Sequence, residues 1–236
     1  QVTWNTLRLN LLSIGFGTAA AVFLAIMLNE IVDRRKTFAR GVQSVMIFPH
    51  FLSWMVVSHI LYAFLATRDG IVNQLLVGAG LDTVYWYGTP GPWTAILTTV
   101  GVWKGVGVGS IIFLSAMAGF DPEIYEAAEI DGASPLTKVF RITIPLLMPV
   151  VTLIVLLRFG RLFNGDFGMI YAIVGDNGML FETTDVIDTY VFRTLRRIGR
   201  PSQAMAVGLY QSVVGFVLVY GSNRLVKRYF PEGALF

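Results

Sequence analysis

Five long apolar stretches constrain the fold of this chain more than any other feature of its sequence. They lie near residues 7–28, 42–65, 93–118, 145–163 and 204–220. A helix needs about 20 mostly apolar residues to cross the hydrocarbon core of a bilayer. The ten-residue alternation that is typical of membrane strands is absent from the sequence. The sequence therefore predicts an all-α membrane protein with about five transmembrane helices in a single domain over residues 1–236.

The amino-acid composition agrees with a membrane protein. Hydrophobic residues make up 55% of the chain and charged residues only 14%, whereas a soluble domain carries about 25% charged residues. The net charge of +3 is too small to indicate a nucleic-acid partner. The chain has no cysteine, so a disulfide, a thiolate nucleophile and a cysteine-ligated metal are excluded. We expect neither a metal site nor catalytic residues.

The basic residues of the links predict which ends of the helices face the cytoplasm. They are concentrated after the first and third apolar stretches and in the tail: Arg34, Arg35, Lys36, Arg40, Lys138, Arg141, Arg224, Lys227 and Arg228. With five spans these three segments fall on one side of the membrane, and an excess of Lys and Arg marks that side as cytoplasmic. The arginines between residues 193 and 200 fall on the opposite side, so they need a separate explanation.

The link at 119–144 interrupts the apolar chain with a charged segment, AGFDPEIYEAAEIDGASPLTKVFRITIP, which begins at Ala118. Asp121-Pro122 and Ser134-Pro135 each place a capping side chain before a proline at the first helical position. Gly132 lies between them, where the end of a helix favours a positive φ. The pattern predicts two short helices with a sharp bend. The second helix is predicted to end at Pro145, where the next span begins.

Small residues give the first short helix a distinctive face. Ile124, Ala127 and Ala128 lie at spacings of three and four, so they share one side of the helix. Alanine allows the backbone of a partner to approach closely, and Glu126 offers a charge to a cationic partner at the edge of that contact. From the residues alone, a solvated loop with well-formed caps remains an equally good interpretation.

The fixed positions of this loop resemble the EAA loop of binding-protein-dependent ABC importer permeases. That pattern is E-A-A, three residues, G, nine residues, I, x, L, P, and only the leucine differs, because Ile144 replaces it. The matching residues are Glu126, Ala127, Ala128, Gly132, Ile142 and Pro145, and Asp131 beside the glycine fits a longer form of the pattern. The resemblance covers nearly the whole chain and implies the type I permease core with a cytoplasmic coupling helix. It also leads us to expect that the first helix of the family and its outer loop are missing.

The resemblance implies a role for the charged loop and a set of partners. The first short helix would be a coupling helix seated in a cleft of a cytoplasmic ATPase subunit. The expected assembly, in the inner membrane of a bacterium, contains two ATPase subunits, a second and related permease subunit, and an external solute-binding protein. ATP and Mg²⁺ would be bound by the ATPase, because the glycines of residues 105–110 lack the Lys-Ser/Thr of a phosphate-binding loop. We therefore expect no cofactor on this chain and no enzymatic activity of its own.

Two segments resemble a particular group within this family. The segments WKGVGVGSIIFLSAMAGFDPEIYEAAEIDGAS and ETTDVIDTYVFRTL are similar to permeases for polysaccharides and complex oligosaccharides, a group that includes alginate importer subunits. The resemblance implies that the transported solute is a sugar, and more specifically an oligosaccharide or polysaccharide.

Three cations lie within or near the predicted spans. A Lys or Arg at the centre of a membrane helix costs about 2.5–3.5 kcal/mol on insertion scales, so it usually faces a cavity or a partner. Lys104 lies near the middle of its span, whereas Arg158 and Arg161 lie nearer the outer end and could reach the interface. Either these residues pair with other groups or extend to the membrane interface, or they line a water-filled translocation path.

The outer segment TTDVIDTYVFRTLRRIGR predicts an amphipathic helix. Its apolar residues recur at helical spacing: Val186, Tyr190, Val191, Leu195 and Ile198. Such a helix could lie on the membrane surface, or it could contact the solute-binding protein through Tyr190, Arg193, Arg196 and Arg197. Together with the three cations of the spans, these arginines favour an acidic oligosaccharide as the solute.

Other classes of protein fit the sequence less well. A secondary transporter or a channel would need carboxylates within its spans as a coupling device, and the acidic residues here lie almost entirely in the links. An intramembrane enzyme is disfavoured because the two histidines, His50 and His59, form no HExxH or Ser-His pattern. A membrane scaffold without transport activity also fits the composition. Co-purification with an ATPase distinguishes a transporter from a channel, and hydrolysis stimulated by substrate distinguishes a transporter from a scaffold.

Overall fold

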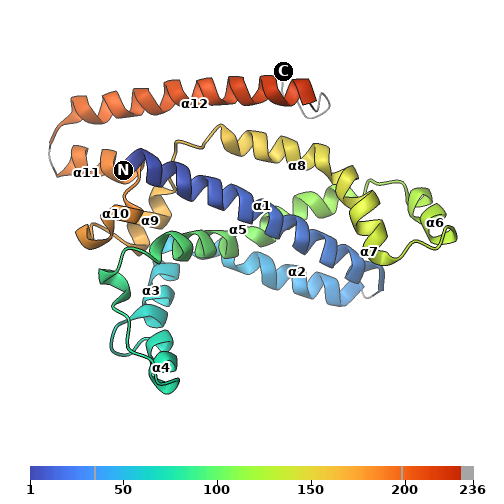
Figure 1. The fold of residues 1–236 in the computed structure, drawn as a ribbon, viewed down its shortest axis with the longest axis horizontal. Coiled ribbons are helices and arrows are strands. Elements are labelled where there is room, and N and C mark those ends of the chain that lie inside the picture. Colours follow the sequence, from blue (N-terminus) through green and yellow to red (C-terminus); the bar gives the residue numbers. More distant parts are fainter. Residues whose placement is uncertain (35, 198, 230–236) are drawn as a thin grey trace. The chain divides into compact units, whose positions relative to one another are not determined.

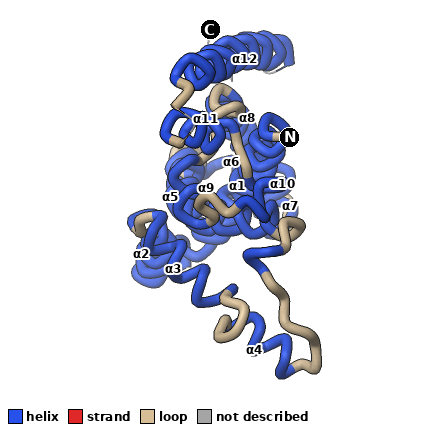
Figure 2. Tube along the Cα trace, turned by 90° about the vertical axis from the view of Figure 1, so that its left-hand side faces the viewer, coloured by secondary structure: helices blue, strands red, loops and turns tan. Residues whose placement is uncertain are grey.

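The computed structural model describes residues 1–34, 36–197 and 199–229. Helices, turns and loops account for this part of the chain, and no β-strand occurs within it (Figure 2). The all-α class predicted from the sequence is therefore confirmed. Four of the main helices are α1 (Val2–Arg34), α5 (Trp93–Met117), α8 (Ile144–Phe159) and α12 (Pro201–Tyr229) (Figure 1).

Other helical segments connect these elements, and α2 among them is as long as α8. They are α2 (Lys36–Phe51), α3 (Trp54–Leu65), α4 (Ile71–Gly78), α6 (Pro122–Ile130), α7 (Pro135–Lys138), α9 (Phe167–Ile173), α10 (Phe181–Thr184) and α11 (Ile187–Arg196). Two 3₁₀ turns, η1 (Trp86–Gly88) and η3 (Gly178–Leu180), and one π-helical turn, η2 (Val139–Thr143), complete the described secondary structure.

Length and composition identify helices that could cross a membrane. Four of those within the described ranges are long and apolar enough: Val2–Ile31, Trp93–Met117, Pro135–Phe159 and Pro201–Arg228. A fifth candidate is the pair Thr37–Phe51 and Trp54–Leu65, which passes the same test only as one broken span. Large apolar side chains such as Phe16, Phe23 and Phe216 are exposed on these helices, as expected of surfaces that meet lipid or another helix.

The stretch predicted as a single span over residues 42–65 is divided into α2 and α3. A new helix begins after Ser53, whose Oγ accepts a hydrogen bond from the backbone N–H of Val56 at 3.3 Å. At the end of α2, Lys104 Nζ donates to the carbonyl oxygen of His50 at 2.7 Å. The last carbonyls of a helix have no partner within it, so a cation from another segment stabilises this end.

Pro145 opens the next span, as predicted, but the helix before it does not end there. Helical backbone continues from α7 through η2 into α8 without a gap, and Pro145 lies in the first turn of α8. A proline ring normally clashes with the carbonyl four residues earlier. The wider π-helical turn immediately before it relieves that clash, because its hydrogen bonds span five residues rather than four. The charged loop is consequently joined to the membrane helix by continuous helical backbone.

The chain forms two compact units, each with its own apolar core. The first contains residues 1–13, 51–101 and 161–215, and its core is built around Trp93, Leu97 and Ile170. The second contains residues 14–50, residues 102–160 and the chain from Phe216 onward. Its core is built from Ala21, Ala25, Phe113, Met117 and Leu147.

Buried asparagines organise the loops of the first unit. Asn73 is 1% exposed, and its Nδ2 donates to the carbonyl oxygens of Ala66, Thr67 and Val84 at 3.4, 3.1 and 2.9 Å. Its Oδ1 accepts hydrogen bonds from the backbone N–H of Val84 and from Nε1 of Trp86. One side chain thereby holds together loops that have no regular hydrogen-bonding pattern of their own.

Asn5 has a corresponding role at the start of α1. It is 1% exposed and donates to the carbonyl oxygens of Glu182 and Asp185 at 3.0 and 3.1 Å. Thr6 Oγ1 accepts from the backbone N–H of Ile187 at 3.0 Å. The N-terminal turn of α1 therefore fixes the segment that leads into α11.

Glycine allows helices of the second unit to approach closely. A Cβ atom at Gly107 of α5 would lie 2.0 Å from the carbonyl oxygen of Met46 in α2. A Cβ atom at Gly109 would lie 3.1 Å from the Cβ of Ala21 in α1. These contacts agree with the general use of small residues where membrane helices meet.

Candidate functional site

The charged loop forms the two capped helices that the sequence predicts. At α6, the side chain of Asp121 accepts from the backbone N–H of Glu123 at 2.9 Å, and at α7 the Oγ of Ser134 accepts from Thr137 N at 3.2 Å. Gly132 has φ +77, which confirms the predicted positive φ between the helices. Its Cβ position is open, with nothing within 4 Å, so backbone conformation rather than lack of space favours glycine there.

Most of α6 faces away from the rest of the chain. Only Tyr125 and Ala128 are partly buried within this helix, whereas Glu126 and Ala127 are exposed. Apolar side chains are also exposed along the loop: Ile124 is 43% exposed, Ile130 87%, Leu136 70% and Phe140 66%. Exposed apolar groups within an otherwise polar segment are typical of a surface that binds a partner.

The other predicted residues of this loop follow α6 along the chain. Asp131 and Gly132 are exposed at the bend, Ile142 is half-buried in η2, and Pro145 is exposed at the start of α8. The seven residues of the motif therefore follow one continuous arm, which runs from α6 to α8 (Figure 1).

Two side-chain contacts hold α6 against that arm. Tyr125 Oη lies 3.1 Å from Thr143 Oγ1, and Thr143 is 6% exposed. Lys138 Nζ donates to Glu129 Oε1 at 2.5 Å, and this hydrogen bond lowers the pKa of the Glu129 carboxyl. Tyr125 and Glu129 are one helical turn apart, so both contacts lie on the inner face of α6.

Two of the arginines between residues 193 and 200 form ion pairs with aspartates of the same chain. Arg193 Nη2 contacts Asp185 Oδ2 at 2.5 Å, and its guanidinium lies 4.2 Å from the ring centre of Phe181. Its Nη1 has no hydrogen bond but lies 3.9 Å from Asp176 Oδ1. Arg197 Nη2 contacts Asp176 Oδ2 at 2.6 Å. Arg193 and Arg197 are therefore paired within the chain, while Arg196 and Arg200 are exposed.

The apolar stripe predicted for this outer helix does not match its burial. Val186 is fully buried at the N-cap of α11, but Tyr190 and Leu195 are 37% and 48% exposed. Ile187 and Thr194 are buried at 2% and 1% exposure. The pairing of Arg193 with Asp185 turns a charged side of α11 inward, so polar as well as apolar contacts determine the orientation of this helix. Ile198 of the predicted stripe and Arg35 of the first basic link lie outside the described residues.

The three cations of the spans differ in their surroundings. Lys104 caps the end of α2, as described above. Arg161 is exposed just beyond α8. Arg158 is half-buried near the end of α8, and its Nη1 lies 3.4 Å from the position that a Cβ of Gly17 would occupy. Within the described ranges Arg158 has no ion pair, although a cation in a membrane helix is costly without one.

The aromatic residues that the sequence places near the outer ends of the spans form a packed group in the first unit. The ring of Tyr87 lies 4.9 Å from that of Trp93, which is fully buried, and 5.6 Å from that of Tyr62. Burial raises the pKa of the Tyr87 hydroxyl to about 12, with a smaller contribution from Tyr62. Tyr62 is 59% exposed, so it is the most accessible of these three rings.

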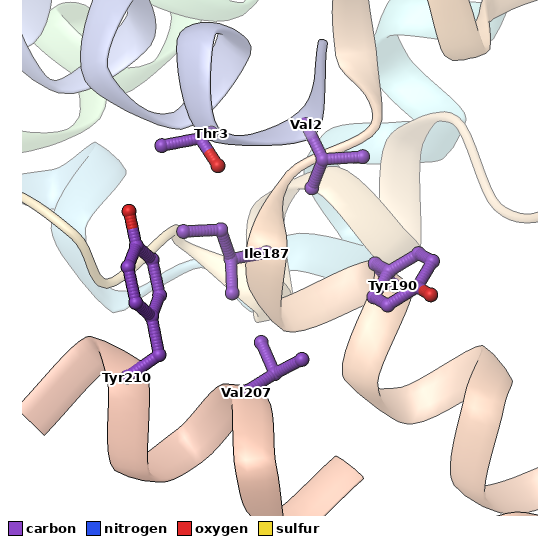
Figure 3. Close-up of a pocket in the computed structure, with 6 residues that line it drawn as sticks. All are labelled: Val2, Thr3, Ile187, Tyr190, Val207 and Tyr210. Atoms are coloured by element: carbon purple, nitrogen blue, oxygen red, sulfur yellow. The ribbon is translucent and has the colours of Figure 1, made fainter. Parts of the chain in front are cut away.

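A small apolar pocket of about 180 Å³ lies between the start of α1, α11 and α12 (Figure 3). Figure 3 shows that its lining comes from all three helices. The residues that line it are Val2, Thr3, Ile187, Tyr190, Val207 and Tyr210. Tyr190, which the sequence suggests as a contact of the solute-binding protein, therefore forms part of a recess.

Another carboxylate in this unit was not found by sequence reasoning. Asp188 Oδ2 accepts from the backbone N–H of Gly165 at 2.5 Å and lies 3.4 Å from Gln211 Nε2. Gln211 Nε2 also donates to the carbonyl oxygen of Phe163 at 2.9 Å. Burial raises the pKa of the Asp188 carboxyl, and the nearby Asp166 adds a smaller effect in the same direction. The sequence carries no local signal for these contacts, because they join residues 23 and 48 positions apart.

Helices long enough to cross a membrane several times, with an exposed and capped arm on one of them, define a multi-pass membrane protein. Comparison with known proteins gives the same class. Residues 17–230 match the family described as "Binding-protein-dependent transport system inner membrane component". Because the match covers most of the chain, the protein belongs to this family.

Several relatives are similar over almost the whole chain. Protein LplB of Bacillus subtilis (strain 168) is 33% identical over 229 residues, which cover 97% of this chain and 71% of LplB. The polygalacturonan/rhamnogalacturonan transport system permease protein YteP of the same organism is 31% identical over 97% of this chain and 70% of its own length.

The fold also matches solved structures. A chain in the crystal structure of a bacterial alginate ABC transporter, in complex with an alginate pentasaccharide-bound periplasmic protein, superimposes with a TM-score of 0.90. It is 33% identical in sequence, and the match covers 97% of this chain and 78% of that one. The type I permease fold expected from the resemblance is therefore confirmed.

Proposed function

We propose that this chain is the membrane-spanning permease subunit of an ATP-driven importer of acidic oligosaccharides. The observation that carries the proposal is the exposed helix α6, which leads through the bend at Gly132 into α7. From α7 the backbone continues through η2 into the membrane helix α8 without a break in helical structure. A rigid arm of this kind can transmit the motion of a soluble motor to a helix in the bilayer. Membership of a binding-protein-dependent transport family supports the same role.

The motor would be a pair of ATPase subunits on the cytoplasmic side, which would also bind ATP and Mg²⁺. The exposed Glu126 and Ala127 are suited to such a contact, since alanine permits close approach and a carboxylate can pair with an arginine. Ile130 and Leu136 add apolar surface next to them. Gly132 sets the bend that presents this surface, while Asp131, Ile142 and Pro145 belong to the arm itself.

The remaining partners would be a second permease subunit and an external solute-binding protein. The solved alginate transporter that this chain resembles was crystallised with a periplasmic binding protein. The exposed Arg196, together with Tyr190 at the rim of the small pocket, is available for that contact. We expect the second permease to be a related chain, and the assembly to lie in the inner membrane of a bacterium.

The chemical class of the solute is inferred from charge and from the relatives. Arg158 is half-buried without an ion pair in the described part of the chain, so an anionic ligand would compensate its charge. Two of the similar proteins are named for acidic polysaccharides, polygalacturonan and alginate. Arg158 would meet a carboxylate in the translocation path, with Arg161 close to it in sequence and Lys104 of α5 as a further cation.

Uptake into proteoliposomes tests this proposal. The permease pair would be reconstituted with its ATPase and binding protein and supplied with matched neutral and acidic oligosaccharides of equal length. We expect uptake that requires ATP and that favours the acidic sugar. Preference for the neutral sugar would overturn the assignment of the solute, and uptake without ATP would overturn the assignment of the transporter class.

A further inference from the structure

We propose that Tyr125 is a positioning residue whose hydrogen bond to Thr143 transmits the displacement of α6 to α8. This inference rests on the proposed function, because it names the contact through which the coupling helix acts. Glu126 and Ala127 face outward and can hold a partner. The bend at Gly132 separates α6 from the continuous helix of α7, η2 and α8. A second contact, on the opposite face of α6, is needed to link the helix to the span.

The Tyr125–Thr143 contact has the geometry for this link. The two hydroxyl oxygens lie 3.1 Å apart, and they join residues 18 positions apart in the chain. Thr143 is 6% exposed and is the last residue of η2, immediately before α8 begins at Ile144. Thr143 Oγ1 also lies 3.5 Å from the carbonyl oxygen of Lys138, at the limit of a hydrogen bond. Tyr125 is consequently the stronger partner of this buried hydroxyl.

The second contact between α6 and the arm, the ion pair of Lys138 with Glu129, contributes less to holding α6 in place. Glu129 is 64% exposed in its ion pair with Lys138. Water and salt screen exposed ion pairs, which commonly contribute little that can be measured. Partial burial shields the hydrogen bond between Tyr125 and Thr143 from water. This hydrogen bond is therefore the main link between α6 and the arm, and the ion pair adds to it.

The π-helical turn explains why the connection is made at Thr143. Single π-helical turns are rare and frequently occur at functional positions. Residues on either side of η2 are in regular α-helix, so the turn is the place where the direction of the arm can change at least cost. A hydrogen bond to the last residue of this turn acts on α8 directly and does not depend on the stiffness of the turn itself.

The test measures sugar imported per ATP hydrolysed in the reconstituted importer. Replacing Tyr125→Phe or Thr143→Val removes one hydroxyl with little change of shape. We expect each variant to lower this ratio about fivefold, the effect of losing one hydrogen bond. The double variant should be no worse than either single one, because both remove the same contact. Thr143→Ser keeps the hydroxyl and should restore the ratio.

Controls separate this inference from folding and from the proposed function. Tyr85→Phe alters an exposed tyrosine of the outer loop and should leave the ratio unchanged. A Tyr125→Phe variant that retains the ATPase on purification has folded, and a ratio equal to that of the natural chain would then overturn the inference. If the natural chain itself neither binds an ATPase nor imports with ATP, the proposed function fails instead.

Discussion

Single buried polar residues hold the first unit together where regular secondary structure is absent. Asn73 satisfies several backbone groups of two loops, and Asn5 does the same beside α10. Buried backbone groups that lose a partner cost about 1–3 kcal/mol each. At the residue scale, therefore, asparagines rather than charged side chains determine the stability of these loops.

Replacement of Asn73 by alanine tests this role. We expect Asn73→Ala to lower the free energy of unfolding by about 3 kcal/mol, because it leaves the N–H and C=O of Val84 without their partner. The thermal unfolding midpoint of the detergent-solubilised protein measures the effect. The neighbouring Gln74→Ala, which removes an exposed side chain, should change stability by less than about 0.5 kcal/mol. Equal midpoints for the two variants would contradict the prediction.

Asp188 makes stability depend on pH. Because burial raises the pKa of its carboxyl above 3.8, the folded chain binds this proton more tightly than the unfolded chain. The resulting stabilisation is complete below about pH 4 and is lost as the pH rises through the raised pKa. We expect the stability of the natural chain relative to Asp188→Asn to fall over that window.

The asparagine variant keeps an oxygen that can accept the N–H of Gly165, so the geometry of the site is retained. Unfolding midpoints of both proteins across the acidic range measure the difference. A natural chain that gains stability relative to the variant as the pH rises would show that the pKa of Asp188 is lowered rather than raised.

At the scale of elements, the glycines of α5 are not equivalent. A Cβ at Gly107 would lie 2.0 Å from a backbone oxygen of α2, whereas a Cβ at Gly105 would have nothing within 4 Å. We expect Gly107→Ala to destabilise the protein by about 1–3 kcal/mol, since α2 must move. Gly105→Ala should be neutral or stabilising, because alanine favours helix. Thermal unfolding of the two single variants distinguishes a packing contact from a general need for flexibility.

The bend after α6 depends on a single backbone conformation. A valine at position 132 would have to adopt φ +77, which costs about 1–2 kcal/mol for a residue with a side chain. We expect Gly132→Val to uncouple transport from ATP hydrolysis while membrane insertion remains intact. Asn tolerates this conformation, so Gly132→Asn is the matched control and should retain most activity. Normal stimulated hydrolysis and normal uptake in the valine variant would refute the role of the bend.

At the scale of the whole molecule, the charge of Arg158, which has no ion pair among the described residues, should influence which solute is carried. We expect Arg158→Gln to reduce the stimulation of hydrolysis by acidic oligosaccharides about tenfold, because a hydrogen bond to a charged group contributes about 1.5–3 kcal/mol. Stimulation by neutral sugars should change little. Arg68→Gln, which alters an exposed arginine of the outer loop, serves as the control for net charge. An equal loss with both classes of sugar would indicate a structural role for Arg158.

Much of the candidate site could be predicted because its determinants are local. The caps at Asp121 and Ser134 and the positive φ of Gly132 arise from interactions within a few residues, so the sequence pattern specifies them. The apolar stretches likewise specify helices, because their length matches that of a bilayer. These local signals also carried the resemblance to the transport family.

Other features arise from contacts between distant segments, and only the tertiary structure decided them. Helical backbone runs through Pro145 because a π-helical turn precedes it, and the stretch over residues 42–65 is interrupted between Phe51 and Trp54. The pairing of Arg193 with Asp185, and of Tyr125 with Thr143, depends on how the chain returns to itself. Composition and helical spacing describe one segment at a time, whereas the partner of a buried polar group is set by the three-dimensional packing that brings two segments together.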